Sequence, residues 1–156
     1  MPDFMNIAEN KVALFNYQIL ESWEAGIKLT GSEVKAVKKG LINLKGSFIS
    51  IKTNRRGRNE VWLKDAHIAR YAKAGYAQSS YDPLQERKLL LSAKELKYLV
   101  GAVKRPGLTI LPLSVYTSKR LIKIKVGLAK GKGQLDKRQA IKKRDVERQI
   151  QRSINR

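Results

Sequence analysis

Strict two-residue alternation between apolar and polar side chains is the feature that most limits the folds open to this chain. In residues 119–128 every even position from 122 to 128 is aliphatic, whereas the odd positions include Lys123 and Lys125. This period is that of a β-strand with one buried face. A weaker alternation over Phe15–Leu29 predicts a second long strand, bent near Glu24-Ala25-Gly26. The chain is therefore expected to fold around a sheet.

Shorter segments complete the predicted sheet. Residues 44–52, 60–64 and 108–116 have the composition of strands, and a tight turn near Thr117-Ser118 would join the last of them to 119–128. Several short strands joined by hairpins favour a closed or strongly curled antiparallel barrel, which leaves few strand edges exposed. The loop Asn54–Asn59, with sequence NRRGRN, carries three arginines. It is either a finger that contacts RNA or a solvated hairpin tip.

Two helices are predicted within this mainly β, α+β fold. The first covers about 32–39 and ends at Gly40, a residue suited to the left-handed position after a helix. The second begins at Ser92, where Ser92 and Glu95 have the spacing of a capping box, and is stopped by Pro106-Gly107.

The charge of the chain points to a polyanionic partner. Its 156 residues include 33 Lys and Arg against 13 Asp and Glu, a formal net charge of +20. The charge is uneven: residues 119–156 hold fourteen basic and three acidic side chains, whereas residues 1–118 hold nineteen and ten. Self-repulsion of this size is best offset by a nucleic acid.

The last residues of the chain differ from the rest. After Lys130 a single row of aliphatic side chains, Val146, Ile150 and Ile154, is too narrow for the apolar face of a packed helix. Each buried aliphatic side chain contributes about 1.5–3 kcal/mol, whereas ordering each residue costs about 1–2 kcal/mol. We therefore expect two parts, a folded domain over 1–130 and a basic tail over 131–156. The tail should be disordered when free and helical on a partner.

Other functional classes find little support in the sequence. The chain has no cysteine and one histidine, His67, which leaves no cysteine or multi-histidine metal site. No cofactor loop or acid–base constellation is recognisable, so we expect neither an enzyme nor a bound cofactor. The N-terminus lacks a basic segment followed by an apolar run, and no apolar run approaches the ~20 residues that span a bilayer. The chain is expected to be cytoplasmic, and its composition fits an RNA-binding protein with a basic tail and a basic structural ribosomal protein equally well.

Three segments resemble the SsrA-binding protein (SmpB) family. Residues 10–40 contain an Asn-Lys start, a Glu-Ala-Gly-Ile bend and a Gly-x-Glu-Val-Lys helix. Residues 82–96 contain Asp-Pro followed by Arg-Lys-Leu-Leu-Leu, and residues 123–145 contain Gly-x-Ala-Lys-Gly-Lys followed by Asp-Lys-Arg. All three segments occur in the family's order.

The resemblance implies an oligonucleotide-binding (OB) type barrel and a role in bacterial trans-translation. Such a protein binds the tRNA-like domain of transfer-messenger RNA (tmRNA) and delivers it to ribosomes stalled on truncated messages. The tail probes the decoding centre of the small subunit and the empty mRNA channel. The resemblance also implies that the chain acts as a monomer, with elongation factor Tu bound to alanyl-tmRNA during delivery.

Residue by residue, the resemblance assigns two sets of contacts. The tmRNA contacts would be Asn10, Lys11, Glu24, Lys88 and Leu90. Many relatives have histidine before the Asp-Lys-Arg motif, where this chain has leucine, which offers apolar contact without aromatic stacking. The ribosome contacts of the tail would be Lys130, Lys132, Leu135, Asp136, Lys137, Arg138, Lys142, Lys143, Arg144 and Arg148.

Overall fold

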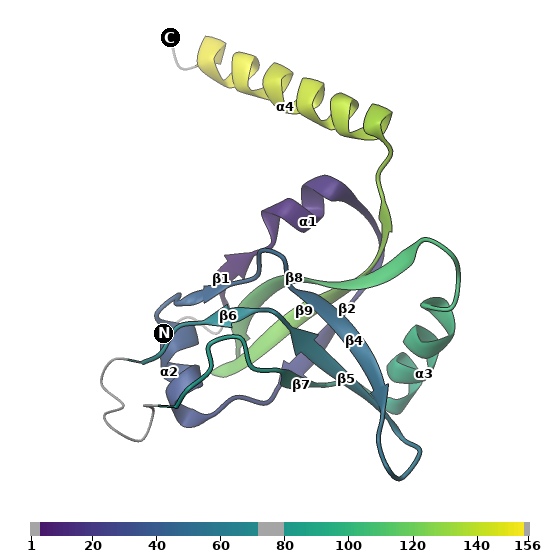
Figure 1. Ribbon diagram of the computed structural model, residues 1–156. Coiled ribbons are helices and arrows are strands. Elements are labelled where there is room, and N and C mark those ends of the chain that lie inside the picture. The colour runs from purple at the N-terminus through teal and green to yellow at the C-terminus, as the bar shows by residue number, and fades with distance from the viewer. Residues whose placement is uncertain (1–3, 72–79, 155–156) are drawn as a thin grey trace.

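The computed structural model describes residues 4–71 and 80–154 (Figure 1). In this part of the chain a seven-stranded antiparallel sheet and a two-stranded sheet are accompanied by four helices. The strands are β1 (Phe4–Glu9), β2 (Tyr17–Ile27), β3 (Ile42–Asn43), β4 (Phe48–Thr53), β5 (Asn59–Lys64), β6 (His67–Ile68), β7 (Arg87–Leu90), β8 (Leu108–Ser118) and β9 (Leu121–Gly131). The helices are α1 (Lys11–Asn16), α2 (Gly31–Lys38), α3 (Ala93–Ala102) and α4 (Gln134–Ile154).

The large sheet is open, so the predicted closed or strongly curled OB-type barrel is wrong. Its strand order is β1-β8-β9-β2-β7-β5-β4, which leaves β1 and β4 as the two edges. β1 pairs with β8 and β4 pairs with β5, and no ladder joins the two edge strands. Alternation specifies which side chains are buried, but it does not specify whether the two edge strands meet. The mainly β composition with short helices is as predicted.

The main core lies on one face of this sheet, and a smaller buried cluster of Ala13, Leu111 and Ala129 lies on the other. The alternation predicted for residues 119–128 is present in β9, where Ile124 and Val126 are fully buried and Lys125 is exposed. Helix α2 adds Val37 and helix α3 adds Leu99 to the same apolar cluster. The sheet and these two helices therefore share one core, and burial of each large aliphatic side chain contributes about 1.5–3 kcal/mol.

Two local details differ from the sequence predictions. The turn between β8 and β9 is Lys119-Arg120, two residues beyond the predicted position, and both residues have positive φ (49° and 68°), as a type I′ hairpin requires. In β2 the irregular register lies between Ile19 and Glu21, not near Glu24-Ala25-Gly26. Elements β1, α1, β3, β6 and β7 were not predicted.

Both predicted helices are present, but their N-terminal caps differ from each other. Helix α2 is capped by Thr30, whose side chain accepts from the amide of Glu33 while the Glu33 carboxylate accepts from the amide of Thr30. In α3 the Ser92 hydroxyl accepts from the Glu95 amide at 3.2 Å. The reciprocal bond from the Ser92 amide to the Glu95 carboxylate does not form, so only half of the predicted capping box exists.

The tail is a continuous helix, α4, in place of the disordered free segment that we predicted (Figure 1). The expectation compared ordering entropy with apolar burial, but left out intrinsic helix propensity. No Gly or Pro occurs in α4, and Lys, Arg, Gln and Glu are good helix formers. The base of α4 is also anchored, because the Lys132 amide donates to the Asn16 carbonyl at 2.9 Å.

Candidate nucleic-acid interface

Three of the five predicted tmRNA-contacting residues lie on one face of the sheet. Strand β2 pairs with β7 so that Gly26 is opposite Leu90. A methyl group added at Gly26 would lie 3.4 Å from Leu90 Cβ, so the Leu90 side chain covers this glycine. Because alternate residues share a face, Glu24 joins Gly26, and Lys88 joins Leu90. We call the surface formed by Glu24, Lys88 and Leu90 the outer face.

Glu24 is held in a defined orientation on the outer face. The buried Tyr116 hydroxyl donates a 2.6 Å hydrogen bond to Glu24 Oε2. Burial, reinforced by this bond, raises the pKa of Tyr116, so the hydroxyl remains a donor. Across the strand pair, Glu24 is opposite Lys125, which is exposed. The result is an exposed, oriented carboxylate beside a cation.

A buried ion pair fixes β7, the strand that carries Lys88 and Leu90. Arg87 Nη2 lies 2.6 Å from Glu33 Oε2, and the side chains are 1% and 2% exposed. Arg87 also donates to the Ala66 carbonyl at 2.6 Å and to the Tyr81 hydroxyl at 2.9 Å. Charge-assisted bonds therefore tie β7 to α2 and to the segment before β6.

The pKa values of this network follow from its contacts. Burial opposes ionisation of Glu33, but the hydrogen bond from the Thr30 amide and the contacts with Arg87 outweigh it and lower the pKa of Glu33. Burial, then the neighbouring Glu33 charge, raises the pKa of Tyr81 to about 12. The carboxylate is thus ionised and the phenol protonated at neutral pH.

The structure places Asn10 away from the outer face. Its side chain is 3% exposed, donates to the Pro112 carbonyl at 2.9 Å and accepts from the Ala13 amide at 3.2 Å. Asn10 therefore caps α1 and ties it to β8. Lys11, the next residue, is exposed at the start of α1.

The basic residues of the tail are mostly exposed. In α4, Arg138, Lys142, Lys143, Arg144 and Arg148 are exposed, and Lys130 is exposed near the end of β9. The guanidinium of Arg144 lies 5.5 Å from the centre of the Phe15 ring on α1. The side chains of Leu135, Asp136 and Lys137, in the first turn of α4, lie outside the described part of the structure.

Lys132 differs from the other basic residues at the base of the tail. It is half-buried, and its ammonium group approaches the Leu14 carbonyl at 3.5 Å. Together with its backbone bond to Asn16, this contact makes Lys132 part of the anchor between β9 and α1.

The arginine-rich loop is an ordered hairpin tip between β4 and β5. The Asn54 side chain accepts from the amides of Arg56 and Arg58 at 2.9 and 3.0 Å, and Gly57 takes positive φ (76°). Arg55, Arg56 and Arg58 are exposed. The tip presents three cations on a defined turn, which is compatible with either interpretation of this loop.

Other kinds of site are not apparent among the described residues. In that part of the chain no group of three His, Cys, Asp or Glu side chains is arranged to hold a metal. No described helix is long and apolar enough to cross a membrane.

Sequence reasoning missed two residues that support the outer face. Tyr116 is 92 positions from Glu24, and Arg87 is 54 positions from Glu33. No local pattern links such pairs. The only available signal was an arginine and a tyrosine in segments otherwise expected to be buried, where a polar group needs a partner.

An oriented carboxylate beside the exposed Lys125 and the half-buried Lys88, in a chain that also has an exposed basic helix, is typical of a nucleic-acid-binding protein. The profile of a family described as SmpB protein matches residues 7–156. The SsrA-binding protein of Sulfurihydrogenibium sp. (strain YO3AOP1) is 47% identical over 95% of this chain and 93% of its own. The SsrA-binding protein of Ligilactobacillus salivarius (strain UCC118) is 44% identical over 95% of this chain and 91% of its own.

A solved structure, described as "tmRNA-SmpB: a journey to the center of the bacterial ribosome", is also similar. It superposes with a TM-score of 0.65 at 38% identity and covers 88% of this chain and 95% of its own. The chain belongs to the SmpB family.

Proposed function

We propose that this protein binds tmRNA through its tRNA-like domain and delivers it to ribosomes stalled on truncated messages. The observation that carries the proposal is the outer face, where Glu24, Lys88 and Leu90 come together from two strands. The names of the relatives, which refer to SsrA binding, and the similar tmRNA-SmpB structure support it. A structural ribosomal protein, the alternative from composition, receives no such support.

The outer face would recognise RNA by shape rather than by charge alone. Lys88 can meet a phosphate, and Leu90 offers apolar contact to a base or ribose. The Glu24 carboxylate, oriented by Tyr116, can accept hydrogen bonds from a ribose 2′-OH or a base amino group. Asn10 would act indirectly, because its buried side chain positions α1 and thereby Lys11.

The tail would act as a sensor on the ribosome. Residues 131–156 can enter a channel that is vacant only where message is missing, because the helix and mRNA cannot share that space. Release of counterions from ribosomal RNA would supply the driving force. Leu135, Asp136 and Lys137 would lie nearest the decoding centre. Residues 1–130 would form the independently folded domain that carries the tail.

The remaining assignments follow from this role. The protein would act as a monomer in the cytoplasm, where translation takes place, together with alanyl-tmRNA and elongation factor Tu. Its contribution would be binding and sensing rather than catalysis.

Replacement of Glu24 by Gln tests the outer face. Gln keeps the size of the side chain but removes the charged acceptor, so we expect tmRNA binding to weaken about tenfold, the cost of one or two charge-assisted hydrogen bonds. Attraction by charge alone predicts the reverse, since a negative charge is lost. Filter binding at several salt concentrations distinguishes these outcomes.

The matched control is Glu86→Gln, which removes an exposed carboxylate paired with Lys52 and Lys64. It should leave tmRNA affinity unchanged or slightly tighter. If Glu24→Gln behaves like this control, the outer face is not the recognition surface.

A further inference from the structure

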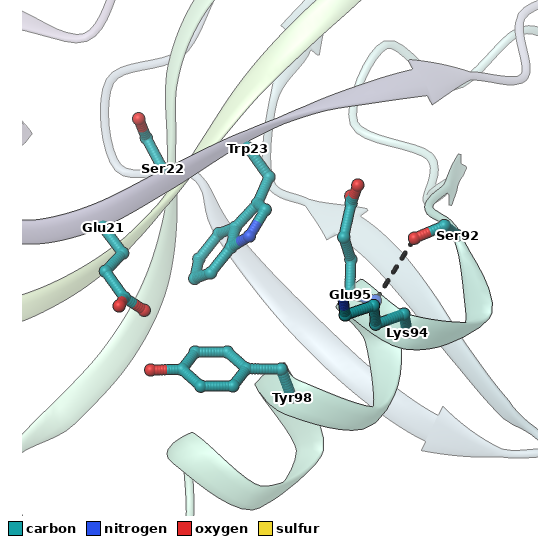
Figure 2. Close-up of a pocket in the computed structure, with 7 residues that line it drawn as sticks. All are labelled: Glu21, Ser22, Trp23, Ser92, Lys94, Glu95 and Tyr98. Carbon is teal, nitrogen blue, oxygen red and sulfur yellow. Dashed lines mark hydrogen bonds between the residues drawn. The ribbon is translucent and has the colours of Figure 1, made fainter.

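A groove between β2 and α3 is not explained by the contacts proposed above. It has a volume of about 620 Å³, and its walls include Trp23 and Tyr98 together with Glu21 and Glu95 (Figure 2). It shares Ser22 and Trp23 with a second hollow around Glu24 and Tyr116. The two hollows therefore meet along β2: Glu21 and Trp23, opposite Leu128 and Val126, project from its core face, whereas Glu24 projects from the outer face.

The aromatic rings of the groove are available for stacking. The centres of Trp23 and Tyr98 are 5.7 Å apart with an angle of 53° between the ring planes. Trp23 packs partly against the core, whereas Tyr98 is 43% exposed. Tyr98 therefore presents ring surface to solvent from a well-supported helix, the arrangement by which proteins stack unpaired RNA bases.

Two carboxylates flank these rings in a chain with a net charge of +20. Interaction with the Glu21 carboxylate raises the pKa of Tyr98. Glu95 is half-buried, and its carboxylate does not bond to the Ser92 amide. Within the described residues this carboxylate has neither a hydrogen bond nor an ion pair. The Glu95 carboxylate is therefore available to accept hydrogen bonds from a ligand.

The chemistry of the groove selects its ligand. Two carboxylates repel a phosphate group, so the backbone of a nucleic acid would not occupy the groove. A guanine base fits, since its N1–H and N2–H groups are adjacent donors that match the two oxygens of a carboxylate. Lys94, on the rim, can meet the phosphate of the same nucleotide.

We propose that this groove holds an unpaired guanine of the bound RNA, stacked on Tyr98 and hydrogen-bonded to Glu95. The inference rests on the proposed function, because it takes RNA to be the ligand of the adjoining outer face. Adenine presents an amino donor beside an acceptor nitrogen and would bind less well, since that nitrogen would meet a carboxylate oxygen.

The fluorescence of Trp23 reports directly on this groove. The chain has two tryptophans, so the full-length Trp62→Phe protein leaves Trp23 as the single emitter. It is titrated with the pentanucleotides UUGUU and UUAUU and with the tRNA-like domain of tmRNA. We expect quenching by all three, with UUGUU binding about tenfold more tightly than UUAUU.

Two variants in this background identify the contacts. Glu95→Gln should abolish the preference for guanine, whereas the control Glu86→Gln, which removes the same charge elsewhere, should keep it. Tyr98→Ala should weaken both pentanucleotides about tenfold. Circular dichroism verifies that each variant is folded.

The outcomes separate this inference from the proposed function. Equal affinity for the two pentanucleotides, or a guanine preference that survives Glu95→Gln, overturns the guanine site. So does filter binding of the tRNA-like domain with no change in Trp23 emission, although tmRNA binding then stands. Failure of the parent to bind the tRNA-like domain in the filter assay overturns the proposed function, whatever the pentanucleotides do.

Discussion

The sheet and helix α4 use the same aliphatic residue types with opposite results. In β9, Ile124 and Val126 are fully buried, whereas in α4 Ile141 is 46%, Val146 53% and Ile150 54% exposed. Strand β9 lies between β8 and β2, and the core covers its apolar face. The aliphatic side chains of α4 have no apolar layer to cover them. The sheet is therefore held by burial, and α4 by backbone propensity and by its anchor at Lys132 and Phe15.

This difference suits two kinds of recognition. A buried core and the Arg87–Glu33 pair keep the outer face in one geometry, as selection of an RNA shape requires. Helix α4 has few contacts to lose, so it can leave α1 and follow the path that a ribosomal channel imposes. A truncation and two substitutions test this division, in decreasing order of their expected consequences.

A chain that ends after Gly133 removes α4 but keeps β9 and the Lys132 anchor. We expect complete loss of tagging on stalled ribosomes, with tmRNA binding and the thermal transition of the sheet unchanged. The reason is that α4 adds almost nothing to the core. Thermal unfolding measures the stability of the sheet, and filter binding measures the affinity for tmRNA. Loss of a cooperative thermal transition would show that α4 is part of the fold.

Replacement of Arg87 by Met breaks the sheet from within. It leaves the buried Glu33 carboxylate without its cation, which should cost about 3–5 kcal/mol of unfolding free energy at pH 7. The exposed pair Lys52–Glu86 is the control, because Lys52→Ala should cost less than about 1 kcal/mol. Urea unfolding measures both values, and similar losses for the two variants would contradict this account of β7.

The pH dependence of the Arg87→Met effect has a defined sign. In the parent the pKa of Glu33 is lowered, so its contribution is present above pH 4.5 and is lost as the pH falls through the folded-state pKa. Without Arg87, burial is the largest remaining influence on Glu33 and raises its pKa. Protonation of Glu33 then removes the unpaired buried charge and reduces the loss of stability in the variant. The difference in stability between parent and variant should therefore shrink between pH 7 and pH 4.

Replacement of Phe15 by Leu tests the weakest link between the two regions. It keeps apolar volume but removes the ring beneath Arg144, a contact worth about 0.5–1 kcal/mol at an exposed site. Because the chain has no cysteine, spin labels can be placed at Arg58→Cys and Gln151→Cys. We expect a broader distribution of distances between the labels.

The control for the last variant is Phe4→Leu, whose ring lies against Tyr116 rather than α4. It should leave the distribution of distances as narrow as in the parent. If Phe15→Leu also leaves it unchanged, the ring does not hold α4 in place.

Local patterns predicted what local physics decides. The alternation in β9 and the glycine that ends α2 were predicted correctly, since Gly40 follows the helix with a φ of 79°, and each depends on neighbours a few residues apart. The barrel was wrong, since the pairing of the edge strands β1 and β4 leaves no mark on alternation. The bend in β2 was also misplaced, because the register shift between Ile19 and Glu21 is set by pairing with β9 and not by a local glycine.

The candidate site shows the same limit. Motifs placed Glu24, Lys88 and Leu90, and the fold brought them together. The motifs could not show that Asn10 is a buried cap or that Tyr116 orients Glu24, because both facts depend on partners about a hundred residues away. For α4, the balance of burial against entropy left out helix propensity, which acts without any tertiary partner.

In the proposed function the sheet binds tmRNA while α4 acts on the ribosome as a helix. Gln149→Pro tests it most directly, because it keeps every charge but costs about 3 kcal/mol or more in a helix interior. Gln149→Ala is the control. Both variants should bind tmRNA like the parent, and only Gln149→Pro should lose tagging of peptides on ribosomes stalled at truncated messages. Tagging by Gln149→Pro at the parental rate would show that the tail works as a flexible polycation, and would contradict the helical mechanism.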